Sequence, residues 1–103
     1  MLIFNITYLV SDKVRAPWLT WVCEQHIPFM LSSNYFSHPQ LARVITSAEQ
    51  EGTSFSVQFR VEDMRTLKSW NQEFSVEFKE ECSRQFGSEV VFFTTVLDLI
   101  DHN

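Results

Sequence analysis

The secondary structure elements that the sequence predicts indicate an α+β fold built on one antiparallel sheet. Two stretches, residues 2–10 and 55–61, alternate apolar and mixed side chains with the period of a β-strand. Residues 14–33 and 67–86 instead repeat apolar side chains every three or four positions, as helices do. A further apolar run follows each helix, so the order becomes strand, helix, strand, strand, helix, strand. This order predicts four antiparallel strands with both helices on one face of the sheet.

The first strand, residues 2–10, has one strongly apolar face. Its members are Leu2, Phe4, Ile6, Tyr8 and Val10. The intervening positions carry a mixed set, namely Ile3, Asn5, Thr7 and Leu9. Because successive side chains of a strand point to opposite faces, the first set should meet the helices and the second should face away from them.

The first helix is expected over residues 14–33, after the start signal Ser11–Asp12. Its apolar stripe consists of Val14, Trp18, Trp21, Val22 and Phe29, with His26 on the flank. Pro28 cannot continue the hydrogen-bond ladder and clashes with the preceding turn, so we expect a kink or a shift of phase there. Asn34 suits the left-handed conformation that often ends a helix.

The second and third strands are expected to form a hairpin. Residues 35–40, which contain His38–Pro39, should form a loop before a strand at 41–46. The polar segment 47–53 has hairpin length and contains a glycine. The third strand then places Phe55, Val57, Phe59 and Val61 on one face and Ser56, Gln58 and Arg60 on the other.

The second helix has the clearest periodicity in the chain. It should begin at Glu62–Asp63 and stop before Gly87. Its apolar stripe consists of Leu67, Trp70, Phe74, Phe78, Cys82 and Phe86. The last strand, residues 89–100, is rich in Val, Phe and Thr, which favour strands.

Together these elements predict a single ferredoxin-like βαββαβ domain over residues 1–103. The sheet face away from the helices keeps Ile3 and Leu9 among polar groups, whereas a wholly solvated face would carry more charge. Two such faces packed across a two-fold axis would form a dimeric α+β barrel. We therefore expect a homodimer through the open sheet face.

Composition and charge exclude several classes of protein. A net charge of −5, with eight scattered Lys and Arg, argues against nucleic acids and anionic membranes as partners. No stretch approaches the roughly 18 apolar residues of a membrane span. Nothing at the start resembles a secretion signal, so we expect a cytoplasmic protein in which Cys23 and Cys82 are reduced thiols.

The inventory of reactive groups predicts neither a metal nor a cofactor. The three histidines have no two members at ligand spacing, and two glycines cannot make a phosphate-binding loop. Ten Phe, three Trp and two Tyr predict a core built from large rings, with a ring-lined cavity as the alternative.

Five polar residues are candidates for binding a ligand. Asn5, Thr7, Arg43, Gln58 and Arg60 could neighbour one another across the sheet. Arginines with amide and hydroxyl groups suit a small carboxylate or enolate. The alternative is that both arginines pair with acidic residues across a dimer interface.

His26 is the candidate catalytic residue, because the ordinary pKa of histidine lies near neutrality. It could carry a proton only if the kink at Pro28 or a dimer partner brings it to a cavity. The alternative is a partly exposed side chain or a packing contact on the helix flank.

With these motifs placed, the chain resembles domain-of-unknown-function family 4286, small bacterial proteins of the dimeric α+β-barrel type. The resemblance rests on Leu2–Thr7, Trp21 followed by His26–Ile27–Pro28, Asn34–Tyr35–Phe36, Arg43, Gln58–Phe59–Arg60 and Phe86–Gly87. A histidine is common in that family where this chain has Cys82, which weakens any proposal that needs a second histidine. The resemblance implies the fold and leaves the activity open.

Two functions follow from these observations. The first is a non-catalytic homodimeric module that binds a small molecule or a protein partner, because no recognisable catalytic set is present. The alternative is a cofactor-independent oxygenase- or isomerase-like enzyme acting on a small carboxylate or aromatic substrate beside the sheet. There an arginine would stabilise an enolate-like anion, and His26 would carry the proton.

Overall fold

A computed structural model of the chain describes residues 1–46 and 51–102. Its elements, in chain order, are β1 (Leu2–Val10), the 3-10 turn η1 (Asp12–Val14), α1 (Arg15–Trp21), the π-helix η2 (Val22–His26), α2 (Ile27–Ser32), β2 (Phe36–Arg43), β3 (Thr53–Val61), α3 (Met64–Phe86), the 3-10 turn η3 (Gly87–Glu89) and β4 (Val90–Asp98). This is the predicted order of strands and helices.

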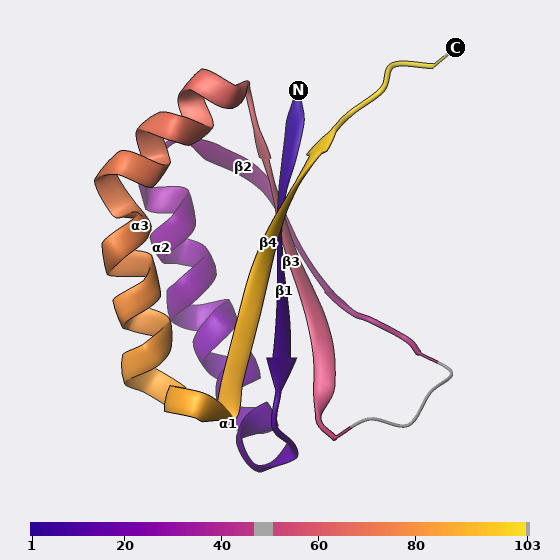
Figure 1. Cartoon of the computed structure of the whole chain (residues 1–103), viewed down its shortest axis with the longest axis vertical. Coiled ribbons are helices and arrows are strands. Elements are labelled where there is room, and N and C mark those ends of the chain that lie inside the picture. The colour runs from indigo at the N-terminus through magenta and orange to yellow at the C-terminus, as the bar shows by residue number, and fades with distance from the viewer. Residues whose placement is uncertain (47–50, 103) are drawn as a thin grey trace.

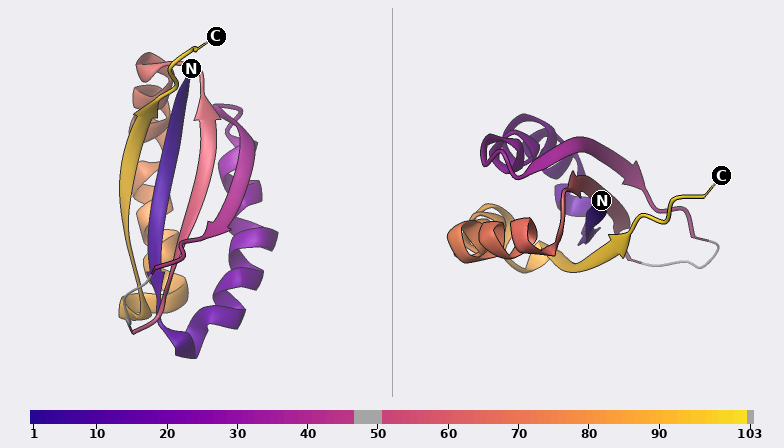
Figure 2. Two further views of the ribbon diagram at one scale, coloured as in Figure 1. Left: turned by 90° about the vertical axis from the view of Figure 1, so that its right-hand side faces the viewer. Right: turned by 90° about the horizontal axis from the view of Figure 1, so that it is seen from above.

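The four strands form one antiparallel sheet in the order β2-β3-β1-β4. The segments α1, η2 and α2 run on as one long helix, and α3 lies beside it. Both helices lie on the same side of the sheet, and the other side is left open (Figures 1 and 2). The predicted ferredoxin-like α+β fold is confirmed.

The register of the central strand β1 settles which side chains face the helices. Phe4 lies opposite Phe59 of β3 and Val96 of β4, and the odd-numbered positions of β1 face the other way. All four even-numbered side chains from Phe4 to Val10 are buried. The alternation seen in the sequence therefore predicted the two faces of β1 and β3.

The core between sheet and helices consists mainly of aromatic rings, as predicted. Trp70 of α3 packs against Phe4 and Phe36, with ring centroids 5.4 and 5.2 Å apart. Towards the other end, Trp18 of α1 packs against Tyr8 and Phe55 at 5.2 and 4.9 Å. Large rings bury much apolar area each, so a thin two-layer domain can still acquire a continuous core.

The prediction for the second strand was wrong in its limits. β2 begins at Phe36 and ends at Arg43, so the segment expected as a loop belongs to the sheet. The ladder to β3 is irregular between Ser37 and Gln40, where His38 has a φ of 52°. Pro39 lacks a backbone donor, and an edge strand with a bulge accommodates it.

The hairpin loop predicted at residues 47–53 lies partly outside the described residues, which resume at Glu51. Gly52 has a φ of 87°, and a Cβ there would lie 2.5 Å from the carbonyl oxygen of Val10. β3 then starts at Thr53, slightly earlier than predicted. The last strand, β4, is shorter at both ends than the predicted 89–100.

The first helix changes its winding ahead of Pro28, which confirms the predicted shift of phase. Residues 22–26 form a π-helix, and the backbone N–H of Ile27 bonds to the carbonyl of Val22, five residues earlier. Pro28 cannot donate to Glu24 and would crowd its carbonyl in a regular α-helix. The wider π turn relieves this conflict, and it rotates the following side chains relative to α1.

Both helix ends follow the predicted signals. Asn34 takes a left-handed conformation with a φ of 65°, and Gly87 ends α3 with a φ of 56°. At the start of α3, the Asp63 carboxylate accepts from the Thr66 backbone N–H at 2.8 Å, which lowers the pKa of Asp63.

Within the described residues, no helix is long and apolar enough to cross a membrane.

Candidate functional site

Four of the five predicted ligand-binding residues lie together on the open face of the sheet. We call Asn5, Thr7, Gln58 and Arg60 the polar patch. Asn5 lies directly opposite Gln58 in the β1–β3 ladder, and Thr7 and Arg60 follow on the same face at the next positions. The alternation of β1 and β3 is sufficient to bring them together.

Only part of the hydrogen-bonding capacity of the polar patch is used within the chain. The Asn5 side-chain amide donates to Thr7 Oγ1 at 3.1 Å, and the Ser56 hydroxyl donates to Asn5 Oδ1. In the part of the chain that the structure describes, neither Gln58 nor Arg60 has a side-chain hydrogen bond or ion pair. Their donors are therefore free for a ligand or a second protein chain.

Arg43 lies apart from the polar patch. It pairs with Phe55, whose buried side chain points towards the helices, so Arg43 belongs to the helix side of the sheet. Its place at the end of the edge strand β2 leaves it exposed. The register of β2 could not be read from the sequence, so it could not be predicted whether Arg43 and Arg60 share a face of the sheet.

The open face also carries large apolar side chains on β1 and β4, interrupted by Asn5, Thr7 and Thr95. We call Leu9, Val91, Phe93 and Leu97 the apolar patch. Leu9 lies opposite Val91, while Phe93 and Leu97 lie opposite Thr7 and Ile3. Phe93 is 62% exposed and Val91 54%. Exposed large apolar side chains that adjoin one another, as Leu9, Val91 and Phe93 do, commonly mark an interaction surface.

His26 lies in the core and not on the helix flank. Its side chain is 1% exposed, stacked between Trp21 and Phe78 with ring centroids 4.6 and 5.3 Å away. Nε2 shares a hydrogen bond of 2.6 Å with the Tyr8 hydroxyl from β1. Nδ1 has no hydrogen-bond partner among the described residues. In a regular α-helix Trp21 and His26 would lie about 140° apart, and the π turn brings them to one side.

Burial controls the protonation of this group. Removal from water lowers the pKa of His26 to about 4, so the imidazole is neutral at physiological pH. Burial, and secondarily the neighbouring Cys82, raises the pKa of Tyr8 well above its usual value. Burial also raises the pKa of the Cys82 thiol to about 12. All three groups are therefore neutral at pH 7.

His26, with its hydrogen-bond partner Tyr8, does not meet the polar patch within the chain. Tyr8 and His26 lie on the helix side of the sheet, whereas Arg60 faces away from the helices. His26 instead adjoins a recess of ≈ 200 Å³ between the first helix and α3. This recess also has Glu77 and Glu81 on its wall. The sequence placed Tyr8 towards the helices but gave no sign that it would contact His26.

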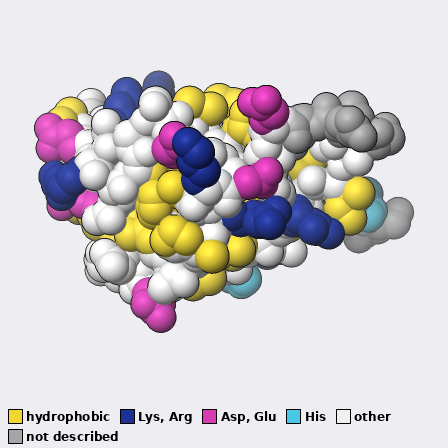
Figure 3. Space-filling view, turned by 90° about the horizontal axis from the view of Figure 1, so that it is seen from below, with side chains coloured by type: hydrophobic (Ala, Val, Ile, Leu, Met, Phe, Trp, Pro, Cys, Tyr) yellow, Lys and Arg dark blue, Asp and Glu magenta, His cyan; other side chains and the backbone are white. Residues whose placement is uncertain are grey.

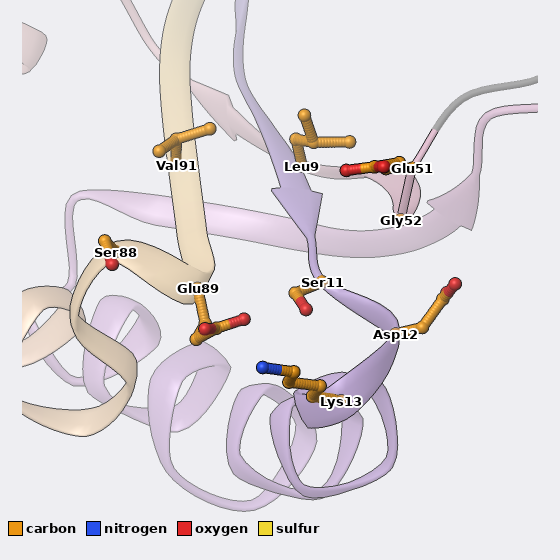
Figure 4. Close-up of a pocket in the computed structure, with 9 residues that line it drawn as sticks. All are labelled: Leu9, Ser11, Asp12, Lys13, Glu51, Gly52, Ser88, Glu89 and Val91. Atoms are coloured by element: carbon orange, nitrogen blue, oxygen red, sulfur yellow. The ribbon is translucent and has the colours of Figure 1, made fainter.

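A hollow larger than the recess beside His26 opens at the end of the sheet where β1 ends and β4 begins. It measures ≈ 410 Å³, and Lys13 and Glu89 lie on the same side of it (Figure 4). None of its polar lining side chains is buried. Acidic and basic side chains are interspersed over this end of the molecule (Figure 3). It is an open surface hollow, and no three His, Cys, Asp or Glu among the described residues are grouped so as to hold a metal ion.

The sheet, its helices and its strand order define a ferredoxin-like α+β protein. Within that class, the model of the domain of unknown function DUF4286 matches residues 1–100, so the chain belongs to this family. No curated protein matches the sequence.

Solved structures share the fold at low sequence identity. A candidate antibiotic biosynthesis monooxygenase from Deinococcus radiodurans has 12% identity and a TM-score of 0.69, covering 100% of this chain and 96% of its own. An ethyl tert-butyl ether d (EthD) family protein from Bacillus halodurans has 10% identity and a TM-score of 0.69, and the match covers 97% of this chain and 100% of its own. A dimeric ferredoxin-like protein from an uncultured marine organism has 10% identity and a TM-score of 0.66, and the match covers 100% of this chain and 98% of its own. At these identities, the similarity concerns the fold.

Proposed function

We propose that the protein is a homodimeric binding module in which the open sheet faces of two protomers pack together. The observation that carries this proposal is the apolar patch, which no part of the described chain covers. A second copy of the chain offers the same patch with the matching shape, and two-fold pairing is the commonest symmetry of oligomers. The ferredoxin-like protein from the uncultured marine organism, which shares this fold, is itself named as dimeric, and this supports the proposal.

The polar patch would then lie inside the interface or at its rim. The Arg60 guanidinium and the Gln58 amide retain free donors, and together they suit a small carboxylate. The competing role for Arg60 is an ion pair with an acidic residue of the partner protomer. Replacing Arg60 with Gln separates the two roles. Ligand binding predicts an unchanged dimer that no longer binds acetate or benzoate, whereas an ion pair predicts a weaker dimer.

Sedimentation equilibrium of two charged variants tests the dimer. Phe93→Lys and Leu97→Lys would each bury an unpaired ammonium between the sheets, which is strongly unfavourable. We expect the wild type to be dimeric at micromolar concentration and both variants to be monomeric and folded. Val76→Lys is the matched control, because Val76 is 68% exposed on α3, away from the sheet. A monomeric wild type, or dimeric Phe93→Lys and Leu97→Lys, would reject the proposal.

A cofactor-independent oxygenase- or isomerase-like enzyme is the second candidate. The observation that favours it is the neutral His26 imidazole, held by Tyr8 beside a recess, with Nδ1 unpartnered. In the tautomer whose Nε2–H donates to the Tyr8 hydroxyl, Nδ1 of the neutral imidazole can accept a proton from an acidic substrate carbon or hydroxyl. Neither Arg43 nor Arg60 adjoins this recess, so the anion would need another stabilising group.

Oxygen uptake and substrate loss with naphthols and 1,3-diketones test the enzyme candidate. Turnover by the wild type should be lost in His26→Gln, whose side-chain amide can still donate a hydrogen bond to the Tyr8 hydroxyl. The Arg60→Gln variant should retain it, because Arg60 lies on the opposite face of the sheet. Equal turnover in wild type and His26→Gln would exclude His26 as the base.

A further inference from the structure

We propose a second binding site, for a small carboxylate with an aromatic or alkyl body, in the groove between α3 and β4. This groove of ≈ 490 Å³ runs along the helix-facing side of the edge strand. Its size lies within the range of about 300–1,000 Å³ typical of small-molecule sites. Figures 1 and 2 show α3 running alongside β4 over most of its length.

The groove exists because the helices cover the centre of the sheet better than its β4 edge. Phe4 of β1 is 5% exposed, but its neighbour Val96, on the same face of β4, is 42% exposed. Across the groove, Met64 at the start of α3 is 47% exposed. Apolar surface on the core side of the sheet is therefore accessible along this edge.

The floor of the groove is aromatic. Trp70 and Phe78 of α3 lie in contact, with ring centroids 5.7 Å apart, and Phe78 contacts Phe92 of β4 at 5.3 Å. All three line the groove, together with Phe4 and Leu67. Such a floor favours a flat ring or an alkyl chain over a polar ligand.

The helix side of the groove carries a polar stripe that selects an anion. Lys68, Asn71, Ser75 and Lys79 recur at spacings of three and four on α3, so they share one helix face. Neither lysine takes part in an ion pair with any described residue. These two ammonium groups therefore place positive charge beside the apolar floor, in a chain whose net charge is −5.

Helix geometry favours Lys79 as the main carboxylate partner. Side chains on a helix lean towards its N-terminus, so Lys79 leans into the groove towards Ser75, one turn earlier. Lys68 leans towards Met64 and the groove's far end. The ligand carboxylate would accept from the Lys79 ammonium and the Ser75 hydroxyl, with its apolar body along the aromatic floor.

Calorimetric titration with octanoate and 4-phenylbutyrate tests the site, with octanol as the uncharged analogue. We expect both carboxylates to bind and Lys79→Gln to weaken them about tenfold, the usual scale for losing one charge-assisted hydrogen bond. Arg65→Gln on the same helix is the control, because Arg65 does not line the groove. Ser75→Trp should block binding by filling the groove, while circular dichroism verifies that each variant is folded.

Three results would overturn the site. One is that neither carboxylate binds the wild type, and another is that octanol binds as tightly as octanoate. The third is that Lys79→Gln and Arg65→Gln behave alike. Phe93 lines the groove and also belongs to the apolar patch, whereas Leu97 of that patch lies outside the groove, so Leu97→Lys is the variant that separates this site from the proposed dimer. The Leu97→Lys variant should therefore bind octanoate as the wild type does, whatever its oligomeric state.

Discussion

His26 is a polar side chain held inside an aromatic core. Its ring lies between Trp21 and Phe78, and its single described hydrogen bond is to the Tyr8 hydroxyl. A buried polar group is tolerated when it is neutral and hydrogen-bonded. The low pKa of His26 and the high pKa of Tyr8 both follow from this burial.

The folded protein should lose stability in acid because of His26. Its pKa is about 4 when folded and ordinarily 6.5, so between these values the unfolded chain binds a proton that the folded chain does not. The contribution is complete above pH 6.5 and is lost as the pH falls towards 4. The stability lost is about 2 kcal/mol at pH 5, out of about 3 kcal/mol in total.

Urea unfolding of the wild type and His26→Gln at pH 7.5 and pH 5 measures this contribution. Glutamine has no proton to gain in this range, so the free energy of unfolding of His26→Gln should fall less than that of the wild type. Subtraction of the two pH differences removes the carboxylates that titrate in both proteins. Equal pH dependence would show that His26 is not buried and neutral.

The two cysteines should react at very different rates. Cys23 is exposed, whereas Cys82 is buried with its pKa raised to about 12, and only the thiolate is the nucleophile. We expect iodoacetamide at pH 8 to modify Cys23 readily and to leave Cys82 unmodified in the folded protein. Mass spectrometry of Cys23→Ser gives the test, with the same variant in urea as control. Rapid modification of folded Cys23→Ser would contradict the packing around Cys82.

The elements show where local sequence determines structure and where packing does. The alternation of β1 and β3 predicted the open face, because one buried face fixes the parity of a strand. Pro28 predicted a disturbance of the first helix, but not that a π turn would rotate His26 into the core. The prediction assumed 3.6 residues per turn throughout the helix, whereas a π turn contains one residue more. It therefore placed His26 on the flank of the helix.

The turn between α2 and β2 depends on the left-handed conformation of Asn34. Its φ of 65° is costly for most residues, tolerated by asparagine and free of cost for glycine. We expect Asn34→Ala to lower the free energy of unfolding by about 1 kcal/mol and Asn34→Gly to leave it unchanged or slightly higher. Chemical denaturation compares the two variants. If alanine and glycine are equivalent at this position, the turn does not impose a positive φ.

For the whole molecule, the open face is the feature that remains without a partner. The helices bury one side of the sheet, while the apolar patch and the free donors of Gln58 and Arg60 lie on the other. A second protomer would cover both. The sequence predicted this surface from β1 and β3, but the exposure of Phe93 and Val91 required the register of β4.

A dimer formed in this way should stabilise the fold by mass action. Association favours the folded state, so the Tm should rise with protein concentration in the wild type. In Phe93→Lys the Tm should be independent of concentration. Differential scanning calorimetry from about 5 to 500 µM provides the comparison, and a wild-type Tm that does not change would argue for a monomer.

The central claim is that two open sheet faces pack against each other. Its most direct test is the distance between spin labels measured by pulsed electron paramagnetic resonance, in a Cys23→Ser background. Labels at Ala42→Cys, at the rim of the open face, should lie closer together across the dimer than labels at Val76→Cys on α3. Packed sheets are about 10 Å apart, and each α3 lies a further layer outward. A shorter Val76 distance, or none for either label, would contradict the claim.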